Sequence, residues 1–363
     1  DGVIYRNVSD VAEVSIGEFV HKSKQNPDGK YPVYNGGTSN TGYYDDYNRT
    51  ANKIIISARG ANAGFVNRVF TNYWSGNSCY TVDITDKNLD WNFAFYWFKS
   101  NELSLLGEQQ KGGIPAVSKK QVEHFRIPVP PLPVQREIVR ILDNFTELTA
   151  ELTAELTARK KQYEFYRDKL LTFGDDVPIF SLSKISTNCD RHRKPVTKGN
   201  REAGIYPYYG ASGIVDYVSD YIFEGDYLLI SEDGANLLAR STPIAFSISG
   251  KNWVNNHAHV LRFDTPVLQK YVEIYLNSLD LSKYISGGAQ PKLNQDNLNK
   301  IPIPIPSNGV KHIVDVLTHF DALCSDLNIG LPAEIEARQK QYEYYRDKLL
   351  TFKELEKEDA KNH

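Results

Sequence analysis

Two loop segments of this sequence combine glycine, small residues and polar side chains in a pattern that suits anion binding. The first is Ser57–Gly64, which follows a β-like apolar run and contains Arg59. Backbone N–H groups of a glycine-rich loop, together with an arginine, can bind a phosphate. A plain glycine turn is the simpler alternative. The related segment Ser231–Asn236 has carboxylates where the first has Arg59. The two segments therefore share a strand-loop pattern but carry side chains of different charge.

Two other segments, Gly112–Lys120 and Gly287–Asn294, begin with paired glycines and continue into lysine or asparagine. We expect each to be a loop that leads into a short helix. The densest basic cluster is Arg191–Lys194, although a charged run is often only solvated surface. The candidates for phosphate or base contacts are Arg59, Asn62, Arg68, Lys111, Lys119, Lys120, Arg191, Arg193, Lys194, Asn236, Arg240, Lys292 and Asn294.

Sequence motifs for catalysis are missing. No Gly-x-x-x-x-Gly-Lys-[Ser/Thr] phosphate loop occurs, and no Asn/Asp-Pro-Pro-aromatic motif of amino-methylating enzymes occurs. His257 and His259 lie two residues apart without a third ligand nearby in the sequence, so we expect structural histidines rather than a metal site. We therefore assign no catalytic residue, no metal ligand and no cofactor to this chain.

Composition is that of an ordinary soluble protein. Hydrophobic residues make up 41% of the 363 residues and charged ones 24%, with a net charge of −3. No apolar run is long enough for a membrane-spanning helix. The cysteines Cys79, Cys189 and Cys324 lie far apart, which fits a reducing cytoplasm better than a disulfide framework. Since no block is strongly basic, any nucleic-acid binding must use local patches on a neutral body.

The elements that position these loops occur twice. Residues 161–173 recur as residues 340–352 with twelve of thirteen positions identical, the exception being Phe165 against Tyr344. Weaker matches flank this pair in the same order, such as Tyr31-Pro32 with Tyr206-Pro207. A repeat this long indicates two domains related by duplication, arranged with pseudo-two-fold symmetry.

The repeated segments are predicted to be long helices. From Ile138, steps of four and three residues give a seam of apolar and aromatic residues, typical of a coiled coil about 40 residues long. In the second copy a continuous helix should break or kink at Gly330 and Pro332. The candidate spacer and partner-docking residues are Leu142, Phe145, Leu152, Leu156, Tyr163, Tyr166, Leu170, Phe320, Tyr342, Tyr345 and Leu349.

Inside the first helix, Thr149-Ala-Glu-Leu152 is repeated as Thr153-Ala-Glu-Leu156. This repeat is either a simple low-complexity helix or a spacer whose length matters. One four-residue unit adds about 6 Å and about 400° of helical turn. That length equals one to two base pairs of DNA at about 3.4 Å each.

The globular blocks combine short β-like runs with helical stretches at 91–106 and 267–281. We therefore predict an α+β protein: two similar globular α+β domains separated by two long antiparallel helices that form a coiled-coil spacer. The expected parts are a first domain at 1–130, a first spacer at 131–173, a second domain at 174–306, a second spacer at 307–352 and a charged tail at 353–363.

This plan resembles the specificity (S) subunits of type I restriction-modification systems. The resemblance rests on the duplication, the proline-rich entries into long helices, the Tyr-Glu-aromatic-Tyr-Arg-Asp-Lys-Leu-Leu-Thr-Phe helix ends and the Thr-Ala-Glu-Leu repeats. It implies a non-catalytic DNA-binding subunit in which each globular domain recognises one half of a bipartite, asymmetric double-stranded target. The helices would set the gap and dock two methyltransferase (M) subunits. S-adenosylmethionine, ATP and Mg²⁺ would belong to the partner subunits, which include restriction (R) subunits.

Two other hypotheses remain at this point. In the first, the chain is a scaffold that joins two copies of a protein partner without binding DNA. In the second, it is an enzyme with a site in its Tyr/Asn-rich blocks. Near-identical helices beside divergent globular blocks favour the DNA-binding hypothesis, because an asymmetric target requires unlike domains.

Overall fold

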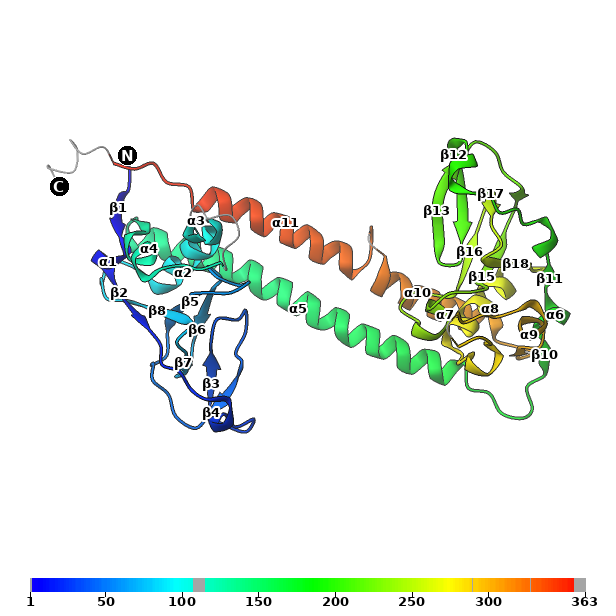
Figure 1. Cartoon of the computed structure of the whole chain (residues 1–363), viewed down its shortest axis with the longest axis horizontal. Coiled ribbons are helices and arrows are strands. Elements are labelled where there is room, and N and C mark those ends of the chain that lie inside the picture. The colour runs from blue at the N-terminus through cyan, green and yellow to red at the C-terminus, as the bar shows by residue number, and fades with distance from the viewer. Residues whose placement is uncertain (1, 107–114, 289, 327, 356–363) are drawn as a thin grey trace. The chain divides into compact units, whose positions relative to one another are not determined.

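The computed structural model describes residues 2–106, 115–288, 290–326 and 328–355 (Figure 1). The chain divides into two units, one made of residues 1–152 and 335–363 and the other of residues 153–334. Within the described ranges, no helix is both long and apolar enough to cross a membrane.

The first unit is an α+β domain. Its elements in chain order are β1 (Ile4–Asn7), α1 (Val8–Val11), β2 (Ala12–Ile16), the 3₁₀ helix η1 (Lys22–Lys24), β3 (Tyr31–Tyr34), β4 (Gly42–Tyr44), β5 (Lys53–Ser57), β6 (Val66–Val69), β7 (Trp74–Ser75), β8 (Cys79–Ile84), α2 (Trp91–Ser100), α3 (Glu102–Leu106), α4 (Lys119–His124) and β9 (Arg126–Val129). The main sheet has the order β2-β8-β5-β6, a smaller sheet has the order β4-β3-β7, and β1 pairs with β9.

Strand β5 explains how this unit is layered. Its alternating side chains point to opposite faces. Ile54 and Ile56 join the main core with Phe93 of α2, whereas Ile55 packs with Tyr73 in a small cluster on the other face. Because both faces are covered, the strand is apolar at three consecutive positions instead of alternating with polar residues.

The second unit repeats this plan. Its elements are β10 (Ile179–Ser181), α6 (Leu182–Ile185), β11 (Thr187–Asn188), η2 (Asp190–His192), η3 (Lys198–Asn200), β12 (Ala203–Gly210), β13 (Gly213–Val218), β14 (Phe223–Glu224), β15 (Tyr227–Ser231), α7 (Asn236–Ala239), β16 (Ala245–Ile248), β17 (Lys251–Val254), β18 (Ala258–Arg262), α8 (Pro266–Ser278), η4 (Ser282–Tyr284), α9 (Gln295–Asn299) and β19 (Pro302–Pro304). The main sheet has the order β11-β18-β15-β16, the smaller sheet has the order β13-β12-β17-β14, and β10 pairs with β19.

Strand pairing shows that the units share one topology. In both smaller sheets the first long strand pairs antiparallel with the next strand and parallel with a later one. Equivalent tryptophans lie on the two parallel partners. The Trp74 indole donates to the carbonyl of Glu18 at 2.8 Å, and the Trp253 indole donates to the carbonyl of Lys194 at 2.7 Å. The predicted duplication is therefore a duplication of fold.

Three long helices complete the units. They are α5 (Leu132–Leu170), α10 (Val310–Ser325) and α11 (Leu331–Leu349). In the first unit α5 and α11 run antiparallel, because Leu142 shares the core with Leu350 while Phe145 stacks on Tyr345 at 5.5 Å between ring centroids (Figure 1). In the second unit α5 packs against α10, where Tyr166 lies 5.9 Å from Phe320.

The remaining seam residues divide between the two cores. Tyr342 and Leu349 pack against the core of the first unit, and Tyr163 and Leu170 pack against that of the second. Leu152 and Leu156 are half-buried on α5. The fold class predicted from the sequence, two similar α+β halves with long helices packed together, is confirmed.

The predicted break in the second helical segment is confirmed. Helix α10 ends at Ser325 and α11 begins at Leu331. Gly330 lies so close to the last turn of α10 that a Cβ atom there would come within 2.6 Å of the Ala322 carbonyl oxygen. Any other residue at this position would collide with backbone.

Candidate nucleic-acid interface

In each unit several loops meet at the carboxyl end of the central strand of the main sheet. In the first unit this strand is β5, and its last residue, Ser57, is buried. The loops come from the end of β3, the end of β5, the turn before β8 and the segment before α4. The joining bonds are Ser57 Oγ to Gly37 O (3.2 Å), Ala58 N–H to Ser78 O (2.8 Å), Gly60 N–H to Pro115 O (2.9 Å) and Val117 N–H to Ala58 O (2.8 Å).

The second unit repeats these bonds one for one at the end of β15. They are Ser231 Oγ to Ala211 O (2.5 Å), Glu232 N–H to His257 O (2.9 Å), Gly234 N–H to Pro291 O (3.1 Å) and Leu293 N–H to Glu232 O (2.8 Å). We call the two assemblies loop cluster 1 (residues 35–37, 57–62, 77–78 and 115–120) and loop cluster 2 (residues 210–212, 231–236, 256–257 and 290–294).

Glycine is required at one turn of this frame. Gly60 and Gly234 have φ angles of +90° and +108°. A Cβ atom at either residue would meet no neighbour within 4 Å. The requirement is therefore conformational, because L-residues rarely adopt this φ region.

The side chains on the shared frame differ. Arg59 in loop cluster 1 occupies the position of Asp233 in loop cluster 2, and Ser78 occupies that of His257. Arg59 is exposed, and its guanidinium has a long contact of 3.5 Å to a backbone carbonyl. The Asp233 carboxylate oxygens lie 2.9 and 3.0 Å from Nδ1 of His257, whose side chain is 52% exposed. Loop cluster 1 thus presents hydrogen-bond donors where loop cluster 2 presents a carboxylate.

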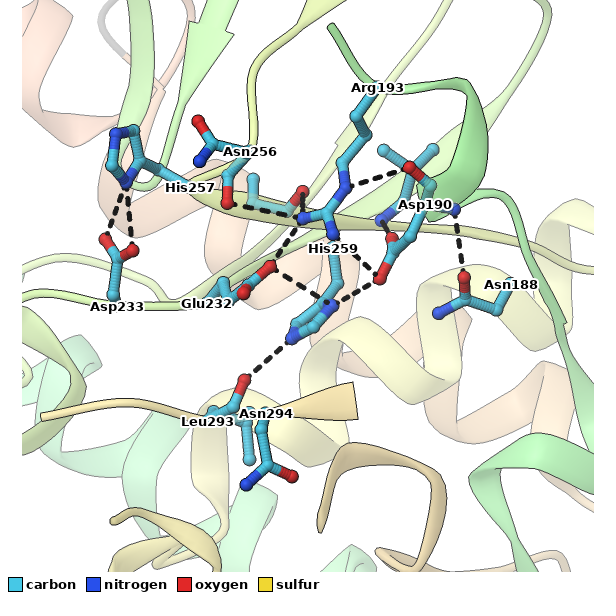
Figure 2. A network of polar contacts seen from close by, with 12 residues as sticks. Asn188, Asp190, Arg193, Glu232, Asp233, Asn256, His257, His259, Leu293 and Asn294 are labelled. Carbon is cyan, nitrogen blue, oxygen red and sulfur yellow. Dashed lines mark hydrogen bonds and ion pairs between the residues drawn. The ribbon is translucent and has the colours of Figure 1, made fainter. Parts of the chain in front are cut away.

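A buried ion network lies beneath loop cluster 2 (Figure 2). Arg193 Nη1 donates to Glu232 at 2.5 Å, and its other terminal nitrogen lies 3.3 Å from Asp190. The His259 ring contacts the Asp190 carboxylate through Nδ1 at 2.6 Å and the Leu293 carbonyl through Nε2 at 2.7 Å. The network therefore fixes Glu232, the neighbour of Asp233, to the strand and loop around it.

Two carboxyl groups of this network have lowered pKa values. Burial raises the pKa of Asp190, but hydrogen bonds from His259 and from the Val260 N–H, with the charge of Arg193, outweigh burial and bring it below its usual range. Burial also raises the pKa of Glu232, and Arg193 and His259 outweigh it in the same way. Both side chains are therefore held as carboxylates among cations.

Asp190, Glu232 and His259 lie close enough together to suggest a metal site. Their ligand atoms are already engaged. Both ring nitrogens of His259 already lie within hydrogen-bond distance of oxygen atoms of the protein. Arg193 and Lys292 neutralise Glu232. The geometry is that of an ion network around His259, whereas the side chain of His257 is exposed. The structural role expected of the two histidines stays a prediction.

The first unit has no counterpart of this network among its described residues. The positions of Asp190, Glu232 and His259 correspond by strand register to Ile16, Ala58 and Tyr80. Ala58 and Tyr80 belong to the core of the first unit, whereas Ile16 is exposed, so buried charge supports only the frame of the second unit among the described residues.

Seven of the sequence-predicted contact residues are exposed, and the structure brings several of them into the loop clusters. Lys119 and Lys120 begin α4, which follows the predicted loop, and Lys119 forms an ion pair with Glu123. Lys292 joins loop cluster 2 and forms an ion pair with Glu232. Lys111 lies outside the described residues. The exposed candidates are Arg59, Asn62, Lys119, Lys120, Arg191, Lys194 and Lys292.

The other candidates make contacts within their own unit. Arg68 donates to Asp143 of α5, and Arg240 donates to the Leu279 carbonyl at 2.8 Å. Arg193 belongs to the buried network. Asn236 closes the turn to Thr242, and Asn294 caps α9 through Asn297 N–H. Their roles in DNA binding stay predictions, and their present contacts are structural.

Sequence reasoning missed two groups of residues. Asp233 and His257 were not chosen, although the alignment of the repeated loops already placed a carboxylate opposite Arg59. Phe165 and Tyr344, one residue away from the predicted seam, have side chains that are 63% and 61% exposed. They are equivalent positions of the repeated helix, and the repeat itself was the available signal.

Comparison with known proteins identifies the family. A family model described as a type I restriction modification DNA specificity domain matches residues 1–159 and 175–337. The chain belongs to this family. It is a specificity subunit, which determines the DNA target of a type I restriction-modification system and is not itself catalytic.

Curated relatives agree with the family model. The chain is 32% identical over 289 residues to the specificity subunit of the type I restriction enzyme EcoR124I/EcoR124II of Escherichia coli, which covers 72% of this chain and 70% of that protein. It is 38% identical over 202 residues to a type I restriction enzyme specificity subunit of Haemophilus influenzae. That match covers 54% of this chain and about half, 52%, of the relative.

The solved structures support the fold of the specificity subunit. The crystal structure of a type I restriction-modification S subunit from M. genitalium matches with a TM-score of 0.65 over 96% of both chains, at 20% identity. A chain from a study of complex assembly and conformational transition of the type I system matches with a TM-score of 0.59, at 13% identity.

Proposed function

We propose that loop clusters 1 and 2 each contact one half of a bipartite, asymmetric double-stranded DNA target. The observation that carries this proposal is the shared backbone frame with unlike side chains. Equivalent bonds hold both frames, while Arg59 is replaced by Asp233 and Ser78 by His257. Such a pair of domains is suited to two different half-sites, because hydrogen-bonding side chains distinguish the base edges of the major groove.

The exposed cations around these loops provide the phosphate contacts in this proposal. Arg59, Lys119 and Lys120 belong to loop cluster 1, and Arg191 and Lys194 lie in the segment that leads into β12. Such contacts orient a protein on the duplex without reading its sequence. Partner subunits share the remaining phosphate contacts, since this chain carries a net charge of −3.

Helix α5 sets the gap between the half-sites in this proposal. It is one helix of 39 residues and contains both Thr-Ala-Glu-Leu units. The helix runs through both units without a break, and within the repeat the Thr149 hydroxyl donates to the Phe145 carbonyl one turn earlier at 2.8 Å. Joining two weak contacts by a helix of set length raises their joint affinity and makes the distance part of the recognised target.

The repeated helix ends provide two equal docking sites for two methyltransferase (M) subunits. S-adenosylmethionine would be bound by those subunits and ATP would be used by the restriction (R) subunits, with Mg²⁺ also expected on the partner subunits. The compartment that fits these partners, and the cysteines of this chain, is the cytoplasm. Twelve identical positions in thirteen favour two copies of one partner over two different partners.

The test is adenine-methylation sequencing of a genome exposed to the methyltransferase partners with and without this chain. We expect a bipartite asymmetric motif only when the chain is present. Exchanging residues 1–130 for the corresponding domain of a relative should change one half of the motif and leave the other half and the gap unchanged. Binding of two partner copies without any DNA motif would instead support a pure scaffold and overturn the proposal.

A further inference from the structure

The two loop clusters present side chains of opposite hydrogen-bonding character at one equivalent position. Arg59 and Asp233 both follow the last buried serine of the central strand by two residues. Each residue forms an isolated β-bridge with the segment before the short helix, Arg59 with Ala116 and Asp233 with Lys292. Their backbones are therefore placed alike, and the difference lies in the side chain.

The Asp233 carboxylate keeps acceptor capacity. Its contacts are with one nitrogen of His257, and a carboxylate has about four acceptor positions. Its side chain is 33% exposed, so the oxygens are accessible. Since Nδ1 of His257 faces the carboxylate, this nitrogen carries the proton and orients the carboxylate group.

The residues beneath Asp233 hold it in place. The next residue towards the strand, Glu232, is tied to Arg193 and to Lys292. The carbonyl of Glu232 also accepts from Leu293 N–H at 2.8 Å (Figure 2 shows Leu293 beneath the network). A carboxylate fixed on such a frame loses little conformational entropy on binding.

An exposed carboxylate is unfavourable beside DNA phosphates, because like charges repel. The presence of the Asp233 carboxylate in a DNA-contacting loop is explained if the carboxylate accepts a hydrogen bond from a base. In the major groove the donors are the exocyclic amino groups, N4 of cytosine and N6 of adenine, whereas guanine presents the acceptors O6 and N7. Arginine pairs with the latter in a bidentate manner.

Resting on the proposed function, we infer that Asp233 recognises an exocyclic amino group, of cytosine or adenine, in one half-site, and that Arg59 recognises a guanine at the equivalent place in the other. Asp233 is a specificity-determining residue of loop cluster 2. His257 is its positioning residue. The half-sites therefore differ in the hydrogen-bonding character of one base edge.

The first experiment compares methylation motifs of the complete complex carrying D233N, D233A or R59K with the wild type. We expect each variant to relax one position in one half-site and to leave the gap unchanged. R59K is informative because lysine keeps the charge but loses the planar pair of donors. If Arg59 contacted only a phosphate, R59K would retain that contact and the methylation motif would be unchanged. An unchanged motif would therefore overturn the assignment of Arg59 to a guanine.

The matched control is D226N, because Asp226 is an exposed carboxylate at the opposite end of β15. It changes the same charge in the same unit and should leave the motif unchanged. If D226N relaxes the motif as D233N does, the effect is general electrostatics and the inference is wrong. The inference also fails if H257N changes the motif while D233N and D233A do not.

The second experiment deletes the amino group instead of the carboxylate. Duplexes carry purine in place of adenine, or pyrimidin-2-one in place of cytosine, at the position that D233N relaxes. We expect about a tenfold loss of affinity for the wild-type complex and no further loss for D233A. Equal losses in wild type and D233A would contradict the inference. If the wild-type chain directs no bipartite motif, the proposed function itself fails, which is a separate outcome.

Discussion

Arg68 of β6 donates a hydrogen bond to Asp143 of α5 at 2.8 Å and thereby ties the main sheet of the first unit to its long helix. The guanidinium also lies over the rings of Phe70, Phe95 and Tyr96, and its side chain is 16% exposed. Asp143 accepts a second bond from the Tyr96 hydroxyl at 2.6 Å. This arginine therefore stabilises the frame that carries loop cluster 1.

We predict that R68M lowers the free energy of unfolding of the first unit by about 1–3 kcal/mol, because it leaves a half-buried carboxylate without its charged partner. The methylation motif should remain unchanged. Thermal unfolding and methylation sequencing check the two parts, with K87M, at an exposed lysine of the same unit, as the control. A changed motif with unchanged stability would show that Arg68 contacts DNA instead.

The buried network predicts acid sensitivity of the second unit. The pKa values of Asp190 and Glu232 are lowered in the folded state. Above the ordinary carboxyl values of about 4, both states are ionised and the network contributes fully. As the pH falls below this range the unfolded chain takes up protons first, so stability decreases until the folded carboxylates are protonated as well.

D190N should remove part of this dependence. At pH 7 we expect it to destabilise the second unit by about 3 kcal/mol, because it removes the carboxylate charge that faces His259 and one terminal nitrogen of Arg193 in a buried network. Between pH 5 and pH 3 its stability should fall less than that of the wild type. Hydrogen exchange of the β15 and β18 amides at several pH values measures both effects, and D226N should match the wild type. Parallel acid profiles for D190N and wild type would contradict this account.

The Thr-Ala-Glu-Leu repeat predicts the gap. Deleting residues 153–156 shortens α5 by about 6 Å and turns its end by about 400°, which is 40° beyond a full turn. We expect a preferred gap shorter by one or two base pairs with both half-site sequences retained. Methylation sequencing of cells that express the variant provides the measurement. Replacing the same four residues by alanines keeps the length and should keep the gap, and an unchanged gap after deletion would reject the spacer role.

The equivalent exposed rings predict the stoichiometry of the complex. Phe165 and Tyr344 are both largely exposed on the repeated helix segment. F165D should abolish the binding of one methyltransferase subunit, Y344D should abolish that of the other, and the double variant should bind neither. Native mass spectrometry counts the bound subunits. T157S, at an exposed position of α5 outside the repeated segment 161–173, serves as the control. Full binding by the double variant would place the docking surface elsewhere.

Local elements followed closely from the sequence. The β-like apolar run that precedes the Ser57–Gly64 loop forms β5, and the helical stretch 91–106 forms α2 and α3 with a break at Asn101. Short-range periodicity and capping residues determine such elements without distant contacts. The roles of Arg68 and Arg240 could not be predicted in this way. Their partners, Asp143 and Leu279, lie far away in the chain and become neighbours only on folding.

By itself, the sequence determined the duplication, the fold class, the long helices and the break near Gly330, because identity and periodicity along the chain are sufficient for these. Only the tertiary structure decided which polar residues meet. It placed Asp233 opposite His257 and buried Asp190 against His259, residues that lie 24 and 69 positions apart. Side-chain partnership depends on strand register and loop closure, and neither is visible in composition or spacing. The physical reason is that burying an unpaired charge costs free energy, whereas a buried charge is tolerated when it is paired. The role of a charged residue therefore depends on which residues surround it in the folded protein.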